Sequence, residues 1–199
     1  MTSRPEGTIG ALGIAGSLRE GSYNRALLRV AAEVAPEDLE IEVFDNEVLK
    51  RIPLYNEDVR AEGDPEPVRA LKDAIRKADA LVIATPEYNH SVAGVLKNAL
   101  DWASRPPDDS PLAGKPVAIM GASTGRWGTV RAQMHLRQLC VDQNMPAVSE
   151  PEVLVADADE KFDDQGRLTH DVTRYFVSEL METLVAWTRK VQADPARLD

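Results

Sequence analysis

The chain has 199 residues with 43% hydrophobic and 28% charged residues, a formal net charge of −10 and an isoelectric point near 4.9. This acidic balance argues against nucleic-acid binding, no apolar run approaches the length of a membrane span, and the N-terminus lacks the apolar core of a signal peptide. The single cysteine, Cys140, precludes an internal disulfide, indicates the reducing cytoplasm and is expected to be buried. The three histidines lack the spacing of metal ligands, which predicts no metal site. The length predicts one domain over residues 1–199.

The first predicted elements are a strand, a polar loop and a helix. Residues 8–15 form an apolar run of strand length, and residues 26–34 carry apolar side chains at helical spacing. A loop that enters a helix N-terminus presents unpaired N–H groups and the positive end of the helix dipole. With the side chains of Ser17, Arg19, Ser22 and Asn24, this arrangement predicts a phosphate-binding loop. In the alternative reading, Ser22 or Asn24 only caps the helix and Arg19 is solvated.

The rest of the chain alternates between strands and helices. Residues 39–44 alternate apolar and charged side chains, as a half-exposed edge strand does. From Asp45 to about Pro67, prolines and a glycine predict irregular structure. Five strands and five helices in alternation predict an α/β fold whose parallel sheet is covered on both faces, with the flavodoxin-like strand order 2-1-3-4-5. The later helices are predicted over residues 68–78, 92–104, 130–143 and 170–190, and the later strands over 80–84, 115–120 and 153–155.

The last predicted helix carries an apolar stripe of Phe176, Leu180, Leu184 and Trp187. We expect this stripe to pack on the sheet.

The loop after the third predicted strand contains Pro86, Glu87, Tyr88 and Asn89. In this topology ligands bind at the carboxyl ends of the strands. A stiff turn, an aromatic wall and an amide that donates and accepts hydrogen bonds suit a planar heterocycle there. In the alternative interpretation the segment has only a structural role as a turn, with Tyr88 packed under it.

The loop after the fourth predicted strand contains Ser123, Thr124 and Gly125. Its glycines allow the backbone to approach a ligand, and its hydroxyls can donate hydrogen bonds. Three unusual loops at one edge of the sheet therefore predict one binding site. The first loop has neither the dinucleotide pattern Gly-x-Gly-x-x-Gly nor the Gly-Lys-Ser/Thr of nucleoside triphosphatases, which favours a mononucleotide.

At these loops the sequence resembles the NADPH-dependent FMN reductase family, a flavodoxin-like group that includes bacterial quinone, azo-dye and chromate reductases. The matching segments are residues 16–24, 86–89, 96–102, 111–116 and 135–138. The resemblance covers nearly the whole chain. It implies FMN held without a covalent bond, and NADPH or NADH as the electron donor. The residues expected to bind the cofactor are Ser17, Arg19, Ser22, Tyr23, Asn24, Pro86, Glu87, Tyr88, Asn89, Ser123, Thr124 and Gly125.

The resemblance also implies how the reaction proceeds. Hydride passes through flavin N5 to a free flavin, a quinone or a similar acceptor in a ping-pong cycle, so no catalytic side chain is required. Glu87 is expected to contribute mainly its backbone. Arg105 either steers an anionic cofactor or acceptor or complements a helix dipole. The competing readings are a flavodoxin-type electron carrier without nicotinamide turnover and a flavin-binding regulatory protein.

A homodimer or homotetramer is expected, because a flavin at the open edge of a sheet needs more enclosing surface than one small domain provides. Helix 93–104 with Trp102 is the preferred interface element, and burial of Trp102 in the monomer core is the alternative. The chain departs from the family at two points. Gly128-Thr129 stands where relatives commonly have two glycines, and Met134 stands where an aromatic residue is frequent.

Overall fold

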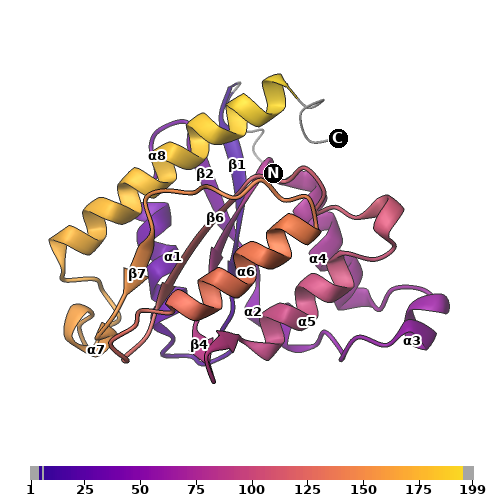
Figure 1. Ribbon diagram of the computed structural model, residues 1–199, viewed down its shortest axis with the longest axis horizontal. Coiled ribbons are helices and arrows are strands. Elements are labelled where there is room, and N and C mark those ends of the chain that lie inside the picture. Colours follow the sequence, from indigo (N-terminus) through magenta and orange to yellow (C-terminus); the bar gives the residue numbers. More distant parts are fainter. Residues whose placement is uncertain (1–4, 6, 195–199) are drawn as a thin grey trace.

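The computed structural model describes residue 5 and residues 7–194, so both ends of the expected domain lie partly outside the described residues. Helices and strands alternate along the chain as the sequence predicts (Figure 1). The strands are β1 (Ile9–Ala15), β2 (Leu39–Val43), β3 (Ala80–Ala84), β4 (Glu87–Tyr88), β5 (Ser91–Val92), β6 (Val117–Ala122) and β7 (Val153–Val155). The α-helices are α1 (Tyr23–Glu33), α2 (Asn46–Lys50), α3 (Glu57–Ala61), α4 (Glu66–Lys77), α5 (Gly94–Ala103), α6 (Val130–Asp142), α7 (Ala158–Lys161) and α8 (Asp171–Ala193).

The main sheet has five strands in the order β2-β1-β3-β6-β7, and all of its pairings are parallel. This order is the flavodoxin-like order 2-1-3-4-5, so the predicted fold class is confirmed. As predicted, β2 lies at an edge, and most of its side chains are exposed whereas those of β1 and β3 are all buried. The loops after β1, β3 and β6 therefore emerge at the same edge of the sheet, next to one another.

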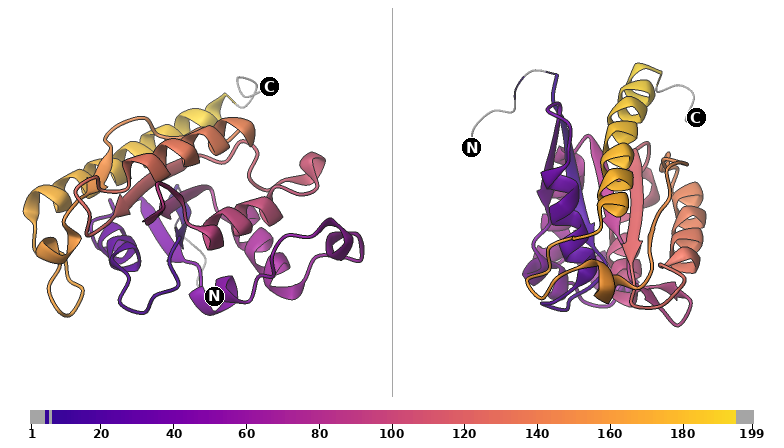
Figure 2. Two further views of the ribbon diagram at one scale, coloured as in Figure 1. Left: turned by 60° about the horizontal axis from the view of Figure 1, so that its bottom comes forward. Right: turned by 90° about the vertical axis from the view of Figure 1, so that its left-hand side faces the viewer.

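Two hydrophobic cores lie on the two faces of the sheet. Alternate residues of each central strand enter different cores, as in β3, where Val82 faces α1 and α8 while Leu81 and Ile83 face α4, α5 and α6. Figure 2 (right) shows α1 and α6 on opposite sides of the sheet. Because both faces are covered, the central strands β1 and β3 are apolar throughout rather than alternating.

The connection between β2 and α4 is more regular than its prolines predict. Two short helices, α2 and α3, lie within it, capped by the side chains of Asp45 and Asn56, and α4 already begins at Glu66. The expectation of irregular structure up to about Pro67 is therefore wrong. Pro53 and Pro65 lie between helices, and Pro67 lies in the first turn of α4, where no intrahelical partner needs its missing N–H.

The closing helix α8 differs from its predicted pattern in one turn. Leu180 and Leu184 are buried as expected, but Phe176 is 43% exposed beside the exposed residues Val172 and Tyr175. The buried side of the first turns of α8 instead carries Thr173 and Val177, and Phe176 lines a surface pocket with Glu150 and Pro151. No helix in the described part of the chain combines the length and the hydropathy needed to span a membrane.

Helix α5 holds the segment after α2 in place. Trp102 is fully buried in the core between the sheet and α5, which excludes it as an interface side chain. The Nε1–H of Trp102 and the Nδ2–H of Asn98 both donate to the carbonyl of Pro53, each at 2.8 Å. Asn98 Oδ1 also accepts from the N–H of Tyr55 at 2.8 Å. Two residues of the segment that resembles the reductase family thus serve the fold.

Candidate functional site: a cleft at the carboxyl ends of the strands

A cavity of about 170 Å³ opens at the edge of the sheet where β4 lies, at the bottom of Figure 1. Three loops form it, following β1, β3 and β6. Ten of the twelve residues expected to bind the cofactor line it; Asn89 and Gly125 are neighbours of the lining rather than part of it. The lining consists of Ser17, Arg19, Ser22, Tyr23, Asn24, Pro86, Glu87, Tyr88, Ala122, Ser123 and Thr124.

The loop after β1 has the features of an anion site. Ser22 is the N-cap of α1, and its Oγ accepts from the N–H of Arg25 at 3.4 Å, so its hydroxyl hydrogen remains available to a ligand. Ser17 and Ser22 are both buried. Arg19 is exposed at the rim, where its guanidinium donates to the carbonyl of Gly21 at 3.1 Å. The first N–H groups of α1 have no partner within the helix and lie at this loop.

Asn24 joins two walls of the cavity. Its Nδ2–H donates to the carbonyl of Ala122 and its Oδ1 accepts from the N–H of Ala122, both at 2.9 Å. The amide therefore fixes α1 to the end of β6, and one Nδ2 hydrogen is left for a ligand.

Asn46 is a supporting residue that sequence reasoning missed. It is buried at the start of α2, and its Nδ2–H donates to the carbonyl of Ser17 at 2.8 Å. This bond fixes the loop after β1 to the start of α2, which follows the neighbouring strand β2. Asp45-Asn46 directly after a strand is the available signal, because polar residues there face the same edge of the sheet.

The loop after β3 is a hairpin rather than an irregular loop. Strands β4 and β5 pair antiparallel, and the two residues between them, Asn89 and His90, have positive φ angles of 50° and 65°. Such angles are typical of a tight two-residue hairpin turn. Tyr88 is 49% exposed and contributes to the lining, so it is not packed under the turn. The carboxylate of Glu87 is directed toward α6, whereas Asn89 stays at the exposed tip.

At the start of the loop after β6, the backbone of Gly121 lies very close to Thr85 and Thr129. A Cβ on Gly121 would lie 2.1 Å from Thr129 Oγ1 and 2.4 Å from the carbonyl of Thr85, so only glycine fits. Thr129 itself has φ 71°, an angle at which a β-branched residue is strained. Ser123 Oγ accepts from the N–H of Gly125 at 3.1 Å, which forms a local turn beside the cavity lining.

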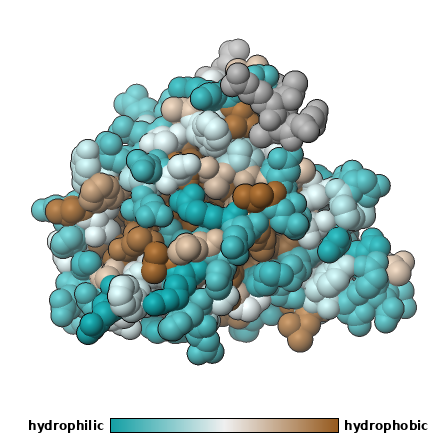
Figure 3. Space-filling view, viewed as in Figure 1, coloured by the Kyte–Doolittle hydropathy of each residue, from teal (hydrophilic) through white to brown (hydrophobic). Residues whose placement is uncertain are grey.

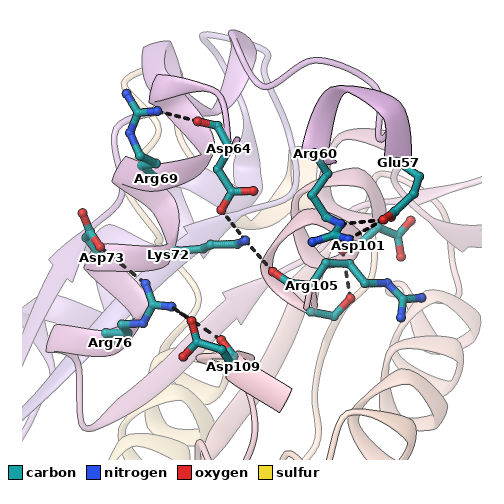
Figure 4. A network of polar contacts seen from close by, with 11 residues as sticks. Glu57, Arg60, Asp64, Arg69, Lys72, Asp73, Arg76, Asp101, Arg105 and Asp109 are labelled. Carbon is teal, nitrogen blue, oxygen red and sulfur yellow. Dashed lines mark hydrogen bonds and ion pairs between the residues drawn. The ribbon is translucent and has the colours of Figure 1, made fainter. Parts of the chain in front are cut away.

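Arg105 lies away from this cavity. It contributes to a separate groove of about 470 Å³ between α5 and α6, and its carbonyl accepts from the Lys72 ammonium, which also pairs with Asp64 (Figure 4). Nearby, hydrogen bonds from Arg60 and Tyr55 lower the pKa of Glu57 to about 2. Lys97 pairs with Asp101 at 2.6 Å on the surface of α5.

The residues at the cavity fit the parts of FMN. Hydroxyls, a guanidinium and a helix N-terminus lie together at the loop after β1, which suits a phosphate. Pro86 and Tyr88 on one side and the backbone of residues 122–124 on the other suit a flat ring. Among the described residues no group of His, Cys, Asp and Glu side chains is arranged to hold a metal ion.

Comparison with known proteins agrees with this geometry. The family model described as NADPH-dependent FMN reductase matches residues 10–160. An NAD(P)H-dependent FMN reductase of Pseudomonas aeruginosa is 51% identical over 184 residues, covering 92% of this chain and 97% of the relative. A 2-hydroxy-1,4-benzoquinone reductase of a Burkholderia species is 41% identical over 176 residues, covering 88% of this chain and 94% of the relative.

Among solved structures, the flavoenzyme NAD(P)H:(acceptor) oxidoreductase FerB of Paracoccus denitrificans superposes with a TM-score of 0.82 at 34% identity, covering 92% of this chain and 98% of that one. The predictions of family, of enzyme class and of FMN with NAD(P)H are confirmed. The chain belongs to the NADPH-dependent FMN reductase family.

Proposed function

We propose that this protein holds FMN in the cavity at the carboxyl ends of β1, β3 and β6. The loop after β1 binds the phosphate through Ser17, Ser22, Arg19 and the first N–H groups of α1. The hairpin and the loop after β6 line the two sides of the ring. The observation that carries this assignment is the convergence of ten of the twelve expected residues on one cavity.

When bound in this cavity, FMN would supply the hydride chemistry between NADPH or NADH and an acceptor, in the ping-pong cycle that we propose. The protein binds and orients the reactants, and Tyr88 offers an exposed aromatic side chain next to the ring site. Quinones are the acceptor class we propose, since relatives with 40–45% identity are named quinone reductases.

The decisive experiment is an anaerobic titration of the FMN-loaded protein with NADPH and with NADH, followed by flavin absorbance near 450 nm. Stoichiometric bleaching that a quinone reverses is the expected result. FMN that binds but is bleached by neither nucleotide would instead support an electron carrier of the flavodoxin type.

A matched pair of variants tests the phosphate loop. Arg19→Met is expected to weaken FMN binding about tenfold, because it removes a charge-assisted contact. Arg29→Met makes the same charge change on an exposed part of α1 and is expected to bind FMN as the wild type does. Equal affinities of the two variants, measured by calorimetry, would remove Arg19 from the site.

We further propose that the protein is a homodimer that completes the cavity walls. Large apolar side chains are exposed around the cavity edge and on α6, and Trp127 and Met134 are 59% and 61% exposed. Figure 3 shows apolar patches between hydrophilic residues on the face that carries α6. Light scattering after gel filtration tests this state. Met134→Arg is expected to yield monomers, and Val172→Arg on α8 serves as the control.

The single free thiol of Cys140 is buried, which supports a reducing compartment, and we propose the cytoplasm. We also propose that residues 1–199 act as one domain, because the five-stranded sheet and both of its cores run through one continuous fold.

A further inference from the structure

Glu87 occupies an unusual position for a residue beside a flavin site. It belongs to the lining of the cavity, yet its side chain is only 10% exposed and points away from the opening. Its Oε2 accepts from the N–H of Arg131 at 2.9 Å and from the N–H of Ala132 at 3.1 Å. Both donors belong to the first turn of α6, which follows the loop on the other side of the cavity.

Helix α6 needs this carboxylate because its own N-cap makes no side-chain bond. Thr129 occupies the cap position with a left-handed backbone, and its hydroxyl accepts from Gln133 instead of capping the helix. A helix start leaves N–H groups unpaired and favours a negative charge. Glu87, 44 residues earlier in the chain than Arg131, supplies both the acceptor for these N–H groups and the negative charge.

The hairpin is attached to α6 at a second point. Ser91 Oγ and His135 Nδ1 lie 3.0 Å apart, one helical turn beyond the contacts of Glu87. The hairpin therefore lies along α6 and is fixed at both of its strands. One wall of the cavity, the hairpin, cannot move relative to the loop before α6 without breaking these bonds.

Glu87 also balances a positive charge. Its Oε1 lies 3.5 Å from the guanidinium of Arg131, which stacks over Trp127 with a distance of 5.2 Å from its Cζ to the ring centroid. Without the carboxylate, this guanidinium would be left uncompensated near the cavity. A positive charge there stabilises a reduced, negatively charged flavin ring.

We propose that Glu87 is a positioning residue that sets the spacing of the two walls of the FMN site by capping α6, and that holds the charge of Arg131 in balance beside it. The proposal rests on FMN binding in this cavity. It assigns to the Glu87 side chain a role separate from the backbone contribution that the sequence predicts.

The test compares Glu87→Gln and Glu87→Ala with Glu66→Gln, which removes a carboxylate from the first turn of α4 where it pairs with Arg51 on the surface. FMN affinity, measured by calorimetry, is expected to fall about tenfold in Glu87→Gln and about a hundredfold in Glu87→Ala, and to stay unchanged in Glu66→Gln. Melting temperatures of the FMN-free proteins show how much of the loss is general destabilisation.

The midpoint potential of the bound FMN distinguishes a role in positioning and charge balance from a general loss of stability, because general destabilisation does not change the potential. Glu87→Gln is expected to raise the potential, and Glu87→Gln/Arg131→Gln to return it toward the wild-type value. Wild-type affinity and potential in Glu87→Gln, or a lower melting temperature alone, would overturn the proposal. If the wild-type protein fails to bind FMN, the proposed function fails first, and this inference with it.

Discussion

The cavity edge and the helical region around α3 and α4 are both rich in polar side chains, but they use them differently. At the cavity, Asn24, Asn46 and Glu87 are largely buried and bind backbone groups 98, 29 and 44 residues away in the sequence. Around α3 and α4, pairs such as Arg60 with Glu57 and Arg76 with Asp109 join partly or largely exposed charges, and Lys72 with Asp64 is the buried exception (Figure 4).

This difference indicates where polar groups determine structure. A buried side chain that satisfies a distant backbone group fixes two loops relative to each other, and its removal leaves an unpaired polar group in the interior. An exposed ion pair contributes little to the free energy of unfolding, because water and salt screen the attraction between its charges. We therefore expect substitutions at the cavity edge to cost far more than those in the exposed ion pairs around α3 and α4.

The largest effect is expected for Gly121→Ala. The new Cβ would overlap the backbone carbonyl of Thr85 as well as the side chain of Thr129. A movement of the Thr129 side chain alone therefore cannot relieve the clash. We expect a loss of about 3 kcal/mol or more in the free energy of unfolding, by analogy with severe overpacking. Gly94→Ala at the start of α5, where nothing lies within 4 Å, is the control and should be neutral or slightly stabilising. A stable Gly121→Ala protein in urea unfolding would contradict the close approach.

Asn24→Ala is expected to be the next most harmful change. It removes two hydrogen bonds and leaves the N–H and the carbonyl of Ala122 without this partner, at a cost of about 2–4 kcal/mol. Asn98→Ala also removes a bridging amide, from a half-exposed position on α5, and should cost less. Chemical denaturation of the two variants ranks them, and the reverse order would break the comparison.

Cys140 extends the comparison to a buried group that can ionise. Burial raises the pKa of its thiol from 9.0 to about 11. The folded state thus favours the neutral thiol, and the stability this provides is complete below pH 9 and is lost as the pH rises toward 11. The loss should reach about 2–3 kcal/mol. Urea unfolding at several pH values should show this loss in the wild type and a smaller one in Cys140→Ala.

The smallest effect is expected for Glu66→Gln. The carboxylate of Glu66 lies 3.0 Å from the guanidinium of Arg51, and both side chains are more than half exposed. We expect a change of about 0.5 kcal/mol or less, and less still in 0.5 M salt. A loss comparable to that of Asn24→Ala would show that exposed pairs stabilise this region after all.

Much of the fold follows from local patterns in the sequence. Apolar runs of strand length and helical spacing locate the central strands and most of α1 and α4, because each pattern reports on burial of that segment alone. The hairpin and the helices α2 and α3 were missed. They depend on capping by Asp45 and Asn56 and on left-handed residues that a proline count does not reveal.

The candidate site divides in the same way. The residues that line the cavity could be chosen from sequence because they follow predicted strands. The hydrogen bonds that hold these loops in place could not be predicted. The pairs Asn46 with Ser17 and Glu87 with Arg131 are distant in the sequence, and only the folded chain brings them together. Phe176 was assigned to the apolar stripe of α8, but the buried face of its first turns runs through Thr173 and Val177, which spacing alone does not distinguish.

The burial of Trp102 gives the protein two separate optical signals. Its indole is enclosed in the core, whereas Trp127 is 59% exposed in the loop beside the cavity. An enclosed indole emits at shorter wavelength than one in water, so the blue part of the intrinsic emission reports on whether the fold is intact. The red part comes from Trp127 at the cavity mouth, with a further contribution from the partly buried Trp187 of α8, and a flavin bound at the cavity would quench the Trp127 component. One emission spectrum therefore distinguishes an unfolded protein from a folded one that has lost its cofactor.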